Sequence, residues 1–183
     1  QNLMNRMLTP HQMPVYKKTN IHEILERVRS LILSEFTSDI NFIRDYDVSL
    51  PEFIVDREKL IQAILNIARN GAQAMKLNNQ DNMQLSFITR AERQIVFRKK
   101  KHATAIRIDI VDNGPGIKNE LIDKIFFPLV TGNENGSGLG LSLAQNLISL
   151  HQGMIDCHSV PGNTVFSIIL PIENNLIPTK EKK

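Results

Sequence analysis

Residues 106–117, IRIDIVDNGPGI, join an alternating strand pattern to a glycine-rich turn. The strand alternates isoleucines with charged residues, which predicts one buried face: Ile106, Ile108 and Ile110 against Arg107 and Asp109. Asp112 ends the strand, and Asp-Asn-Gly is an ordinary turn sequence. A carboxylate at this point also suits a purine pocket, because it accepts a hydrogen bond from an exocyclic amine while Gly114 and Gly116 let the backbone pass beneath the base. The turn alone leaves both interpretations open.

A second glycine-rich segment, GSGLGL at 136–141, runs into a predicted helix at 141–151. Backbone N–H groups at a helix N-terminus favour anions, and glycines let a phosphate come close. The segment is not a Walker loop, because no Lys-Ser or Lys-Thr pair follows it. It is not a dinucleotide fingerprint either, because no strand directly precedes it. By itself it is weak evidence for phosphate binding.

The helix predicted after its capping residue Asp56 has an unusual polar face. Opposite its apolar face, four neutral amides fall within about 80° of one another: Gln62, Asn66, Asn70 and Gln73. Solvated faces usually carry Glu and Lys, whereas an amide oxygen also ligates a hard cation. Gly71 costs the helix about 1 kcal/mol relative to alanine, which indicates that something packs against its backbone. A merely polar helix face remains the alternative.

The remaining patterns predict an α+β fold, a two-layer sandwich with a mixed β-sheet and helices on one face. Isoleucines and leucines at helical spacing predict a first helix from Ile21, capped by Asn20 and Glu23. Strands are expected at 40–47, around Met83–Phe87, at 94–98, 154–159 and 164–170, with a short helix near 118–125 and a helix cap at Gly153. Strands in consecutive pairs disfavour a doubly wound sheet.

The composition of the 183 residues fits one domain with an aliphatic core, since aromatic residues make up 5% and tryptophan is absent. A single cysteine, Cys157, excludes a disulfide framework and favours a cytoplasmic location. No apolar run approaches the roughly 20 residues of a membrane-spanning helix. The net charge is +3, and the basic cluster at 98–101 is expected to be a solvated hairpin tip. Nucleic-acid binding is therefore disfavoured, and a steep salt dependence would be its signature.

Taken in order, the motifs resemble those of one known family. The Asn-x-x-x-Asn helix, Asp-x-Gly-x-Gly, Phe126-Phe127-Pro128 and Gly-x-Gly-Leu-Gly-Leu resemble the N, G1, F and G2 boxes of GHKL ATPases. Within that superfamily, residues 20–172 are similar to the catalytic and ATP-binding domain of sensor histidine kinases, a Bergerat-type fold. The similarity is greatest to the nitrogen-regulation kinases, through RDYDVSLP (44–51), LNIARNGAQA (65–74), FFPLVTG (126–132) and GSGLGLSLAQNLI (136–148). The resemblance implies that residues 1–19 are the end of a dimerisation-domain helix and a linker, and 173–183 a flexible polar tail.

The resemblance also implies roles for single residues. Asn70 matches the ligand of Mg²⁺ that bridges the ATP phosphates, Asn66 lies near those phosphates, and Arg69 is expected to assist. Asp112 matches the adenine-binding aspartate, with Gly114, Gly116 and Ile117 shaping the pocket and Thr164 supporting it, usually through water. The phosphate loop takes in six positions: Gly136, Ser137, Gly138, Leu139, Gly140 and Leu141. Phe126 and Phe127 are expected either to pack or to act as a lid hinge.

Two features depart from the family pattern. The segment between the F and G2 boxes, Thr131–Asn135, holds Asn133 and Glu134 but no Lys or Arg, whereas many relatives place a cation there. Arg69 or a group from another domain is the expected substitute. His22-Glu23-Ile24 imitates the phosphoacceptor box, but it falls on the predicted first helix of the ATP-binding domain, where we expect a surface histidine. His151 is expected as a cation at the end of its helix.

The sequence therefore predicts a domain that passes the γ-phosphate of ATP to a histidine on a separate dimerisation domain. The resemblance implies a homodimeric full-length protein, an NtrC-like response regulator as the next acceptor, and a PII-like signal protein as input. A GHKL hydrolase is one alternative. It is disfavoured because Asn66 stands where a hydrolase carries a water-activating Glu. A nucleotide-gated interaction module without catalysis is the other alternative.

Overall fold

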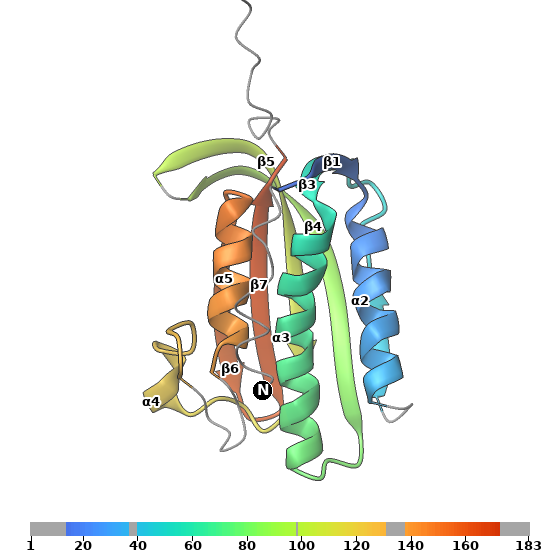
Figure 1. Ribbon diagram of the computed structural model, residues 1–183, viewed down its shortest axis with the longest axis vertical. Helices are drawn as coiled ribbons and strands as arrows, with labels where there is room; N and C mark the ends of the chain where they lie inside the picture. The colour runs from blue at the N-terminus through green and yellow to red at the C-terminus, as the bar shows by residue number, and fades with distance from the viewer. Residues whose placement is uncertain (1–13, 37–39, 98, 131–137, 173–183) are drawn as a thin grey trace, which may run out of the picture.

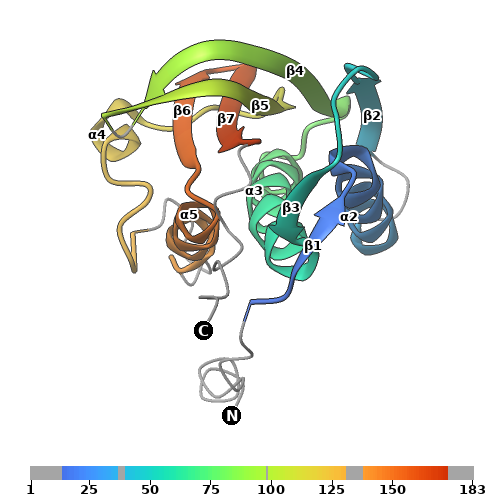
Figure 2. The same cartoon turned by 90° about the horizontal axis from the view of Figure 1, so that it is seen from above.

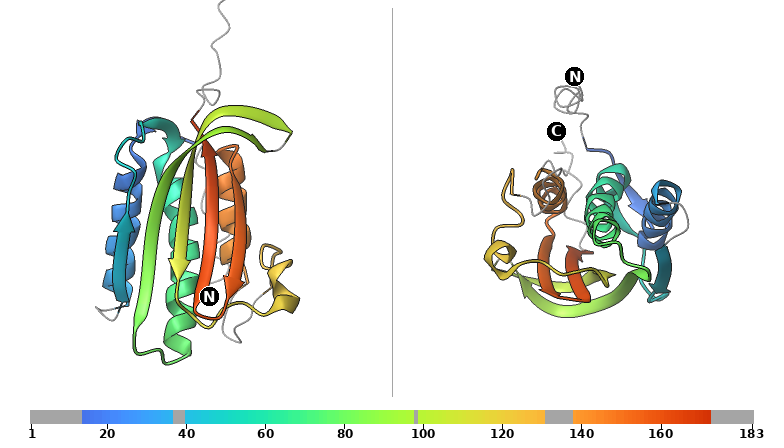
Figure 3. Two further views of the ribbon diagram at one scale, coloured as in Figure 1. Left: turned by 180° about the vertical axis from the view of Figure 1, so that it is seen from behind. Right: turned by 90° about the horizontal axis from the view of Figure 1, so that it is seen from below.

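The computed structural model describes residues 14–36, 40–97, 99–130 and 138–172. Three helices lie side by side over one face of a five-stranded sheet, as Figures 1 and 2 show. The helices are α2 (Ile21–Glu35), α3 (Arg57–Leu77) and α5 (Gly140–Leu150), and a short α4 (Asn119–Ile122) lies at the sheet's edge. The predicted two-layer α+β sandwich is confirmed, and the opposite face of the sheet carries no helix among the described residues (Figure 3).

The main sheet has the order β2-β4-β5-β7-β6. Its strands are β2 (Ile40–Asp45), β4 (Met83–Phe97), β5 (Lys100–Asp112), β6 (Met154–Val160) and β7 (Asn163–Pro171). Strand β2 runs parallel to β4, and the other neighbours are antiparallel, so the sheet is mixed. The prediction of separate strands near 83–87 and 94–98 was wrong, because β4 continues through both stretches. The left-handed residue Gln94, with φ of 51°, interrupts the alternation that a sequence pattern would follow.

A second, two-stranded sheet pairs β1 (Tyr16–Thr19) with β3 (Phe53–Asp56), next to the start of α2 and α3. Asn20 caps α2 as predicted, but its side chain accepts from the N–H of His22 rather than Glu23. Asp56 caps α3 by accepting from the N–H of Lys59 at 3.1 Å, which confirms the predicted start of that helix. Residues 1–13 of the segment predicted at 1–19, and the whole of the predicted tail at 173–183, lie outside the described residues, whereas Tyr16–Thr19 form β1.

The core fills the space between the helices and the inner face of the sheet. It is aliphatic, as the composition indicates, with Phe87 the largest fully buried side chain. The apolar faces predicted for α2 and α3 are buried. On α5, Leu143 and Leu150 are 37% and 50% exposed while Ala144, Leu147 and Ile148 are buried. None of the helices in the described part of the chain is long and apolar enough to cross a membrane.

Candidate functional site

Asp112 is a buried carboxylate at the end of β5, with 7% of its surface exposed. It lies against the backbone of α3 at Gly71, where an added Cβ would stand 2.9 Å from Asp112 Oδ2 and 3.1 Å from its Cβ. The inference that something packs against this mid-helix glycine is confirmed, and the packing group is the Asp112 side chain. Burial raises the pKa of Asp112, and the N–H of Gly114, which donates to Oδ1 at 2.9 Å, opposes that rise. This carboxylate retains acceptor capacity for a further donor.

The two glycines of the turn are required by close contacts. A Cβ on Gly114 would lie 2.8 Å from Asp112 Oδ1 and 3.2 Å from Met75 Cγ. Gly116 has φ of +83°, and a Cβ there would stand 2.9 Å from the nitrogen of Pro161. The N–H of Gly162 donates to the carbonyl of Gly114 at 2.8 Å. The turn after Asp112 is therefore pressed against the turn between β6 and β7.

Asn113 fixes that turn to the loop between α3 and β4. Its Oδ1 accepts from Gln80 Nε2 and from the N–H of Gln84, both at 2.8 Å, and its Nδ2 donates to the carbonyl of Asn82 at 2.8 Å. The sequence analysis did not single out Gln80, because the link depends on how the α3–β4 loop meets the end of β5. The network holds the position from which the Asp112 side chain projects.

Thr164 stands beside Asp112, since the two residues are paired across β5 and β7. It is 3% exposed, and its hydroxyl lies 2.8 Å from that of Ser159 on β6. Ser159 Oγ also accepts from the N–H of Ile117 at 2.9 Å. Asp112, Thr164 and Ile117 thus meet at one end of the sheet, as expected for residues around one ligand.

Asn70 lies beside the N-terminus of α5. A Cβ on Gly140 would stand 3.9 Å from Asn70 Oδ1 and 4.0 Å from its Nδ2. The residue before the helix, Leu139, gives no side-chain cap, so the N-terminal end of α5 keeps its partial positive charge beside an amide oxygen. Leu141 is half-buried at the start of the helix. An anion and a hard cation both find partners in this arrangement.

Gly138 connects the glycine-rich segment to the F-box segment. It has φ of +63°, and a Cβ there would lie 2.6 Å from the carbonyl carbon of Leu129, whose N–H donates to the carbonyl of Gly138 at 2.9 Å. Phe126 packs edge-on against Phe166 with ring centroids 6.3 Å apart, whereas Phe127 is 60% exposed. The predicted phosphate-loop residues Gly136 and Ser137, and the segment 131–135 between the boxes, lie outside the described residues.

Of the other two expected catalytic residues on α3, Asn66 lies on the same side as Asn70, whereas Arg69 is turned toward α2. Asn66 is half-buried, one turn before Asn70. Arg69 faces the end of α2, where its Nε lies 2.9 Å from Glu35 Oε2 and its Nη2 also lies 2.9 Å from that oxygen. The charge of Arg69 is therefore paired by Glu35 rather than directed to the group around Asn70.

Two histidines differ from expectation. His22 lies on α2 as predicted, but it is half-buried, stacked on Tyr46 and 3.0 Å from Thr89 Oγ1. Burial lowers the pKa of His22. His151 is only 1% exposed and neutral: Nε2 accepts from the N–H of Asp56, and Nδ1 lies 2.8 Å from the carbonyl of Leu147. The predicted cation at this helix end was wrong, because an Nε2 that accepts from the N–H of Asp56 carries no proton. Burial also lowers the pKa of His151.

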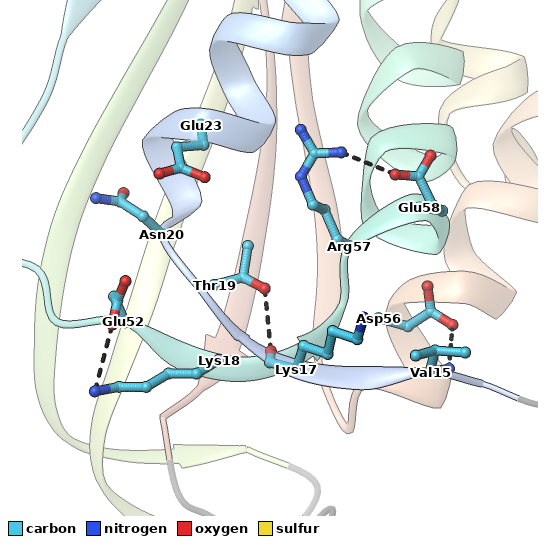
Figure 4. A pocket seen from close by; sticks show the side chains of 10 residues that line it. All are labelled: Val15, Lys17, Lys18, Thr19, Asn20, Glu23, Glu52, Asp56, Arg57 and Glu58. Atoms are coloured by element: carbon cyan, nitrogen blue, oxygen red, sulfur yellow. Dashed lines mark hydrogen bonds and ion pairs between the residues drawn. The ribbon is translucent and has the colours of Figure 1, made fainter.

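A cavity of about 290 Å³ lies at the opposite end of α3 from Asn70 (Figure 4). Its lining includes Asp56, at the start of α3, together with the ion pairs Lys18–Glu52 and Arg57–Glu58. A helix rises about 1.5 Å per residue, which separates Asp56 from Asn70 by roughly 20 Å. The cavity is therefore distinct from the candidate site, and four of its charged side chains pair with one another, as Lys18–Glu52 and Arg57–Glu58.

Comparisons with known proteins point to one family. The family described as histidine kinase-, DNA gyrase B-, and HSP90-like ATPase matches residues 55–174. The "Sensory histidine kinase/phosphatase NtrB" of Vibrio alginolyticus is 45% identical over 93% of this chain and 48% of its own length. The protein of the same name from Salmonella typhimurium is 42% identical over 94% and 48%. The chain thus spans about half the length of these curated relatives.

Solved structures share the fold. The catalytic domain of histidine kinase ThkA has a TM-score of 0.69 at 23% identity, covering 89% of this chain and 99% of that one. The mycobacterial sensor histidine kinase MprB also has a TM-score of 0.69 at 23% identity, covering 86% and 97%. Because the family model matches residues 55–174, well over half of the chain, the chain belongs to the histidine kinase-, DNA gyrase B- and HSP90-like ATPase family.

Proposed function

We propose that this chain is the ATP·Mg²⁺-binding catalytic domain of a nitrogen-regulating sensor histidine kinase. It donates the γ-phosphate of ATP to a histidine on a separate dimerisation domain. One observation carries the proposal: Asp112 lies buried against Gly71 on α3, and Asn70, one residue earlier, faces the N-terminus of α5. The NtrB relatives, at 40–45% identity, support the nitrogen-regulation branch.

The base end of the site recognises adenine through its exocyclic amine. Asp112 accepts from that amine, Thr164 supports the base, and the turn formed by Gly114, Gly116 and Ile117 lies beneath it. A donor that hydrogen-bonds to the Asp112 carboxylate favours its charged form and so lowers the pKa that burial raises. The contacts with Gly71 and Gly114 hold the carboxylate at the end of β5.

The phosphate end combines a helix N-terminus with an amide ligand. Residues 136–141 surround the phosphates, Asn66 lies close to them, and Asn70 holds Mg²⁺ through its side-chain oxygen. Mg²⁺ in such sites takes one or two protein ligands and completes its shell with phosphates and water, so a single Asn fits. In the described part of the chain, no group of three His, Cys, Asp or Glu side chains could hold a metal, which supports binding of the ion together with the nucleotide. The ion supplies charge neutralisation at the transferring phosphate.

Transfer is favoured over hydrolysis by the residue at position 66. A hydrolase of this superfamily needs a carboxylate there to take a proton from water, and the Asn66 amide is no base. The domain then acts by positioning and charge stabilisation. A direct contribution of Arg69 requires the ion pair with Glu35 to open first.

One solved relative supports a response regulator as a partner. The kinase ThkA has been solved in complex with the response regulator protein TrrA. We propose an NtrC-like response regulator as the partner of the full-length protein here, with a PII-like signal protein as its input. The full-length protein is proposed to be a cytoplasmic homodimer.

Calorimetry with ADP tests the nucleotide site. Asp112→Ala should weaken ADP binding by at least about tenfold, because a hydrogen bond to a charged group typically contributes about 1.5–3 kcal/mol. Circular dichroism should show an unchanged fold. Unchanged affinity in the folded variant would place the base elsewhere.

The isolated chain with γ-labelled ATP tests the hydrolase alternative. It should release phosphate slowly and remain unlabelled, since His22 on α2 is half-buried and contacts Tyr46 and Thr89. Rapid phosphate release would move the protein to the hydrolase class. Label that is lost in His22→Gln would show that His22 is an acceptor.

A further inference from the structure

Two hydroxyl groups at the base end of the site form a pair. Ser159 on β6 and Thr164 on β7 face each other in the antiparallel register, with 2.8 Å between Oγ and Oγ1. The N–H of Ile117, at the end of the Asp112 turn, donates to Ser159 Oγ at 2.9 Å. Three consecutive groups thus connect the turn to Thr164, which stands opposite Asp112 on the next strand.

Either hydroxyl of this pair can donate, and the contacts described for Ser159 favour donation from Ser159 to Thr164. A serine hydroxyl has one proton and two acceptor lone pairs, and the Ile117 N–H occupies one of those lone pairs. Among the contacts described for Ser159, the acceptor for its own proton is Thr164 Oγ1. When Ser159 donates to Thr164, the proton of Thr164 turns away from Ser159. The site then presents a donor, Thr164, beside an acceptor, Asp112.

A donor beside an acceptor matches only one kind of purine edge. Adenine carries an amine donor at C6 next to an acceptor at N1. Hypoxanthine and guanine carry a carbonyl acceptor at C6 next to a donor at N1. We infer that Ser159 is a positioning residue that makes the site selective for adenine over 6-oxopurines, by keeping the Thr164 hydroxyl a donor toward the base, directly or through one water. The inference rests on the proposed function, in which Asp112 binds the base.

Calorimetry with ADP and IDP tests the inference, because these nucleotides differ only at C6 and N1 of the base. Ser159→Ala frees the Thr164 hydroxyl to accept as well as donate. The preference for ADP over IDP should fall by about threefold to tenfold, the range of one neutral hydrogen bond. Ser159→Thr keeps a hydroxyl and should keep the preference.

Ser167→Ala is the matched control. Ser167 lies on β7 as well, and its hydroxyl donates to Asp109 at 2.7 Å on the helix-free face of the sheet. Its loss removes a serine hydrogen bond of the same strand without touching the site, so the preference for ADP should remain at the wild-type value.

A double-mutant cycle with Thr164→Val distinguishes an effect of Ser159→Ala that acts through Thr164 from one that acts by altering the turn at Ile117. Thr164→Val should lower the preference for ADP, and adding Ser159→Ala should lower it no further. Equal weakening of ADP and IDP by Ser159→Ala would overturn the inference and leave Ser159 as a support for Ile117. An additional loss of preference in the double variant would overturn it too. A wild-type chain that binds neither nucleotide would instead refute the proposed function, and this inference with it.

Discussion

Asp112 and Gly71 form the contact on which the base end of the site depends. A glycine in the middle of a 21-residue helix weakens the helix, and here the missing side chain leaves room for a carboxylate from the sheet. The two residues are 41 positions apart in the chain. A glycine inside a helix and a buried carboxylate each lower stability locally, and the contact between them explains why both are present. Burial disfavours the charged form of a carboxylate and raises the pKa of Asp112. A further hydrogen-bond donor, such as the amine of a bound base, would stabilise the charged form.

The coupling between these residues is measurable by urea unfolding. Gly71→Ala should destabilise the otherwise wild-type chain, because the new Cβ would lie 2.9 Å from Asp112 Oδ2. In the Asp112→Ala background the change should be less costly by about 1 kcal/mol, since the carboxylate is gone while the gain in helix propensity remains. Additive effects of the two substitutions would contradict the contact.

At the residue scale, the sequence supports some predictions and hides others. Asp112, Asn70 and the glycines are recognisable because their types are unusual for a strand end or a helix face. Asn113, Gln80 and Ser159 are ordinary polar residues in turns or strand ends. Their roles arise from hydrogen bonds to residues far along the chain, such as Ser159 to Ile117, 42 positions away. No local pattern carries that information.

Helices α3 and α5 pack side by side and run in opposite directions, as Figure 1 shows. The end of α3 that carries Asn70 therefore meets the beginning of α5 at Gly140. The short strands β1 and β3 escaped prediction, because four residues such as YKKT have no clear alternation and their partner lies more than 30 residues away in the chain. Helical spacing alone does not show how wide a face the sheet covers, so it does not reveal that Leu143 and Leu150 are exposed.

The effect of Mg²⁺ on ATP affinity tests whether the ion binds where α3 contacts the start of α5. Asn70→Ala should reduce the gain in ATP affinity on adding Mg²⁺ by about tenfold, because an amide oxygen that contacts a cation is lost. Titrations with ATP in Mg²⁺ and in EDTA measure the gain. Gln62→Ala removes an exposed amide two turns earlier on α3 and should respond as wild type. An unchanged metal response in Asn70→Ala would place the ion elsewhere.

His151 joins the end of α5 to the start of α3, where Asp56 and Tyr16 surround it. Burial lowers its pKa in the folded chain below the unfolded value near 6.5. Stability is therefore fully present above about pH 6.5 and falls on acidification, because the unfolded chain then binds a proton that the folded chain does not.

The His151→Gln variant should lose less stability than wild type between pH 7.5 and 5.5. The two proteins can differ in the slope of unfolding free energy against pH by at most about 1.4 kcal/mol per pH unit, which corresponds to the uptake of one proton on unfolding. Urea unfolding at a series of pH values gives both curves. Parallel curves for the two proteins would show that His151 does not take part in acid destabilisation.

At the scale of the whole molecule, the candidate site and the entry of the chain lie at opposite ends of the helices. The Asp112 and Asn70 groups lie where α3 finishes and α5 begins, whereas β1 enters at the other end and is tied to both helices there. Val15 N–H donates to Asp56 Oδ2 at 2.9 Å, and the Tyr16 hydroxyl donates to the carbonyl of Leu150 at 3.4 Å. The layered architecture was predictable from the periodicities and the family resemblance. The parallel pairing of β2 with β4 was not, because it joins segments that no short turn connects.

The central claim concerns where the phosphate goes, and a transfer assay tests it most directly. The chain is mixed with γ-labelled ATP, Mg²⁺ and the separately produced histidine hairpin domain of an NtrB-type kinase. The account predicts label on the hairpin domain alone, stable in base and labile in acid, and absent when Asp112→Ala replaces the wild-type chain. A hairpin domain that stays unlabelled while wild-type chain binds ATP, or label that appears equally with Asp112→Ala, would contradict it.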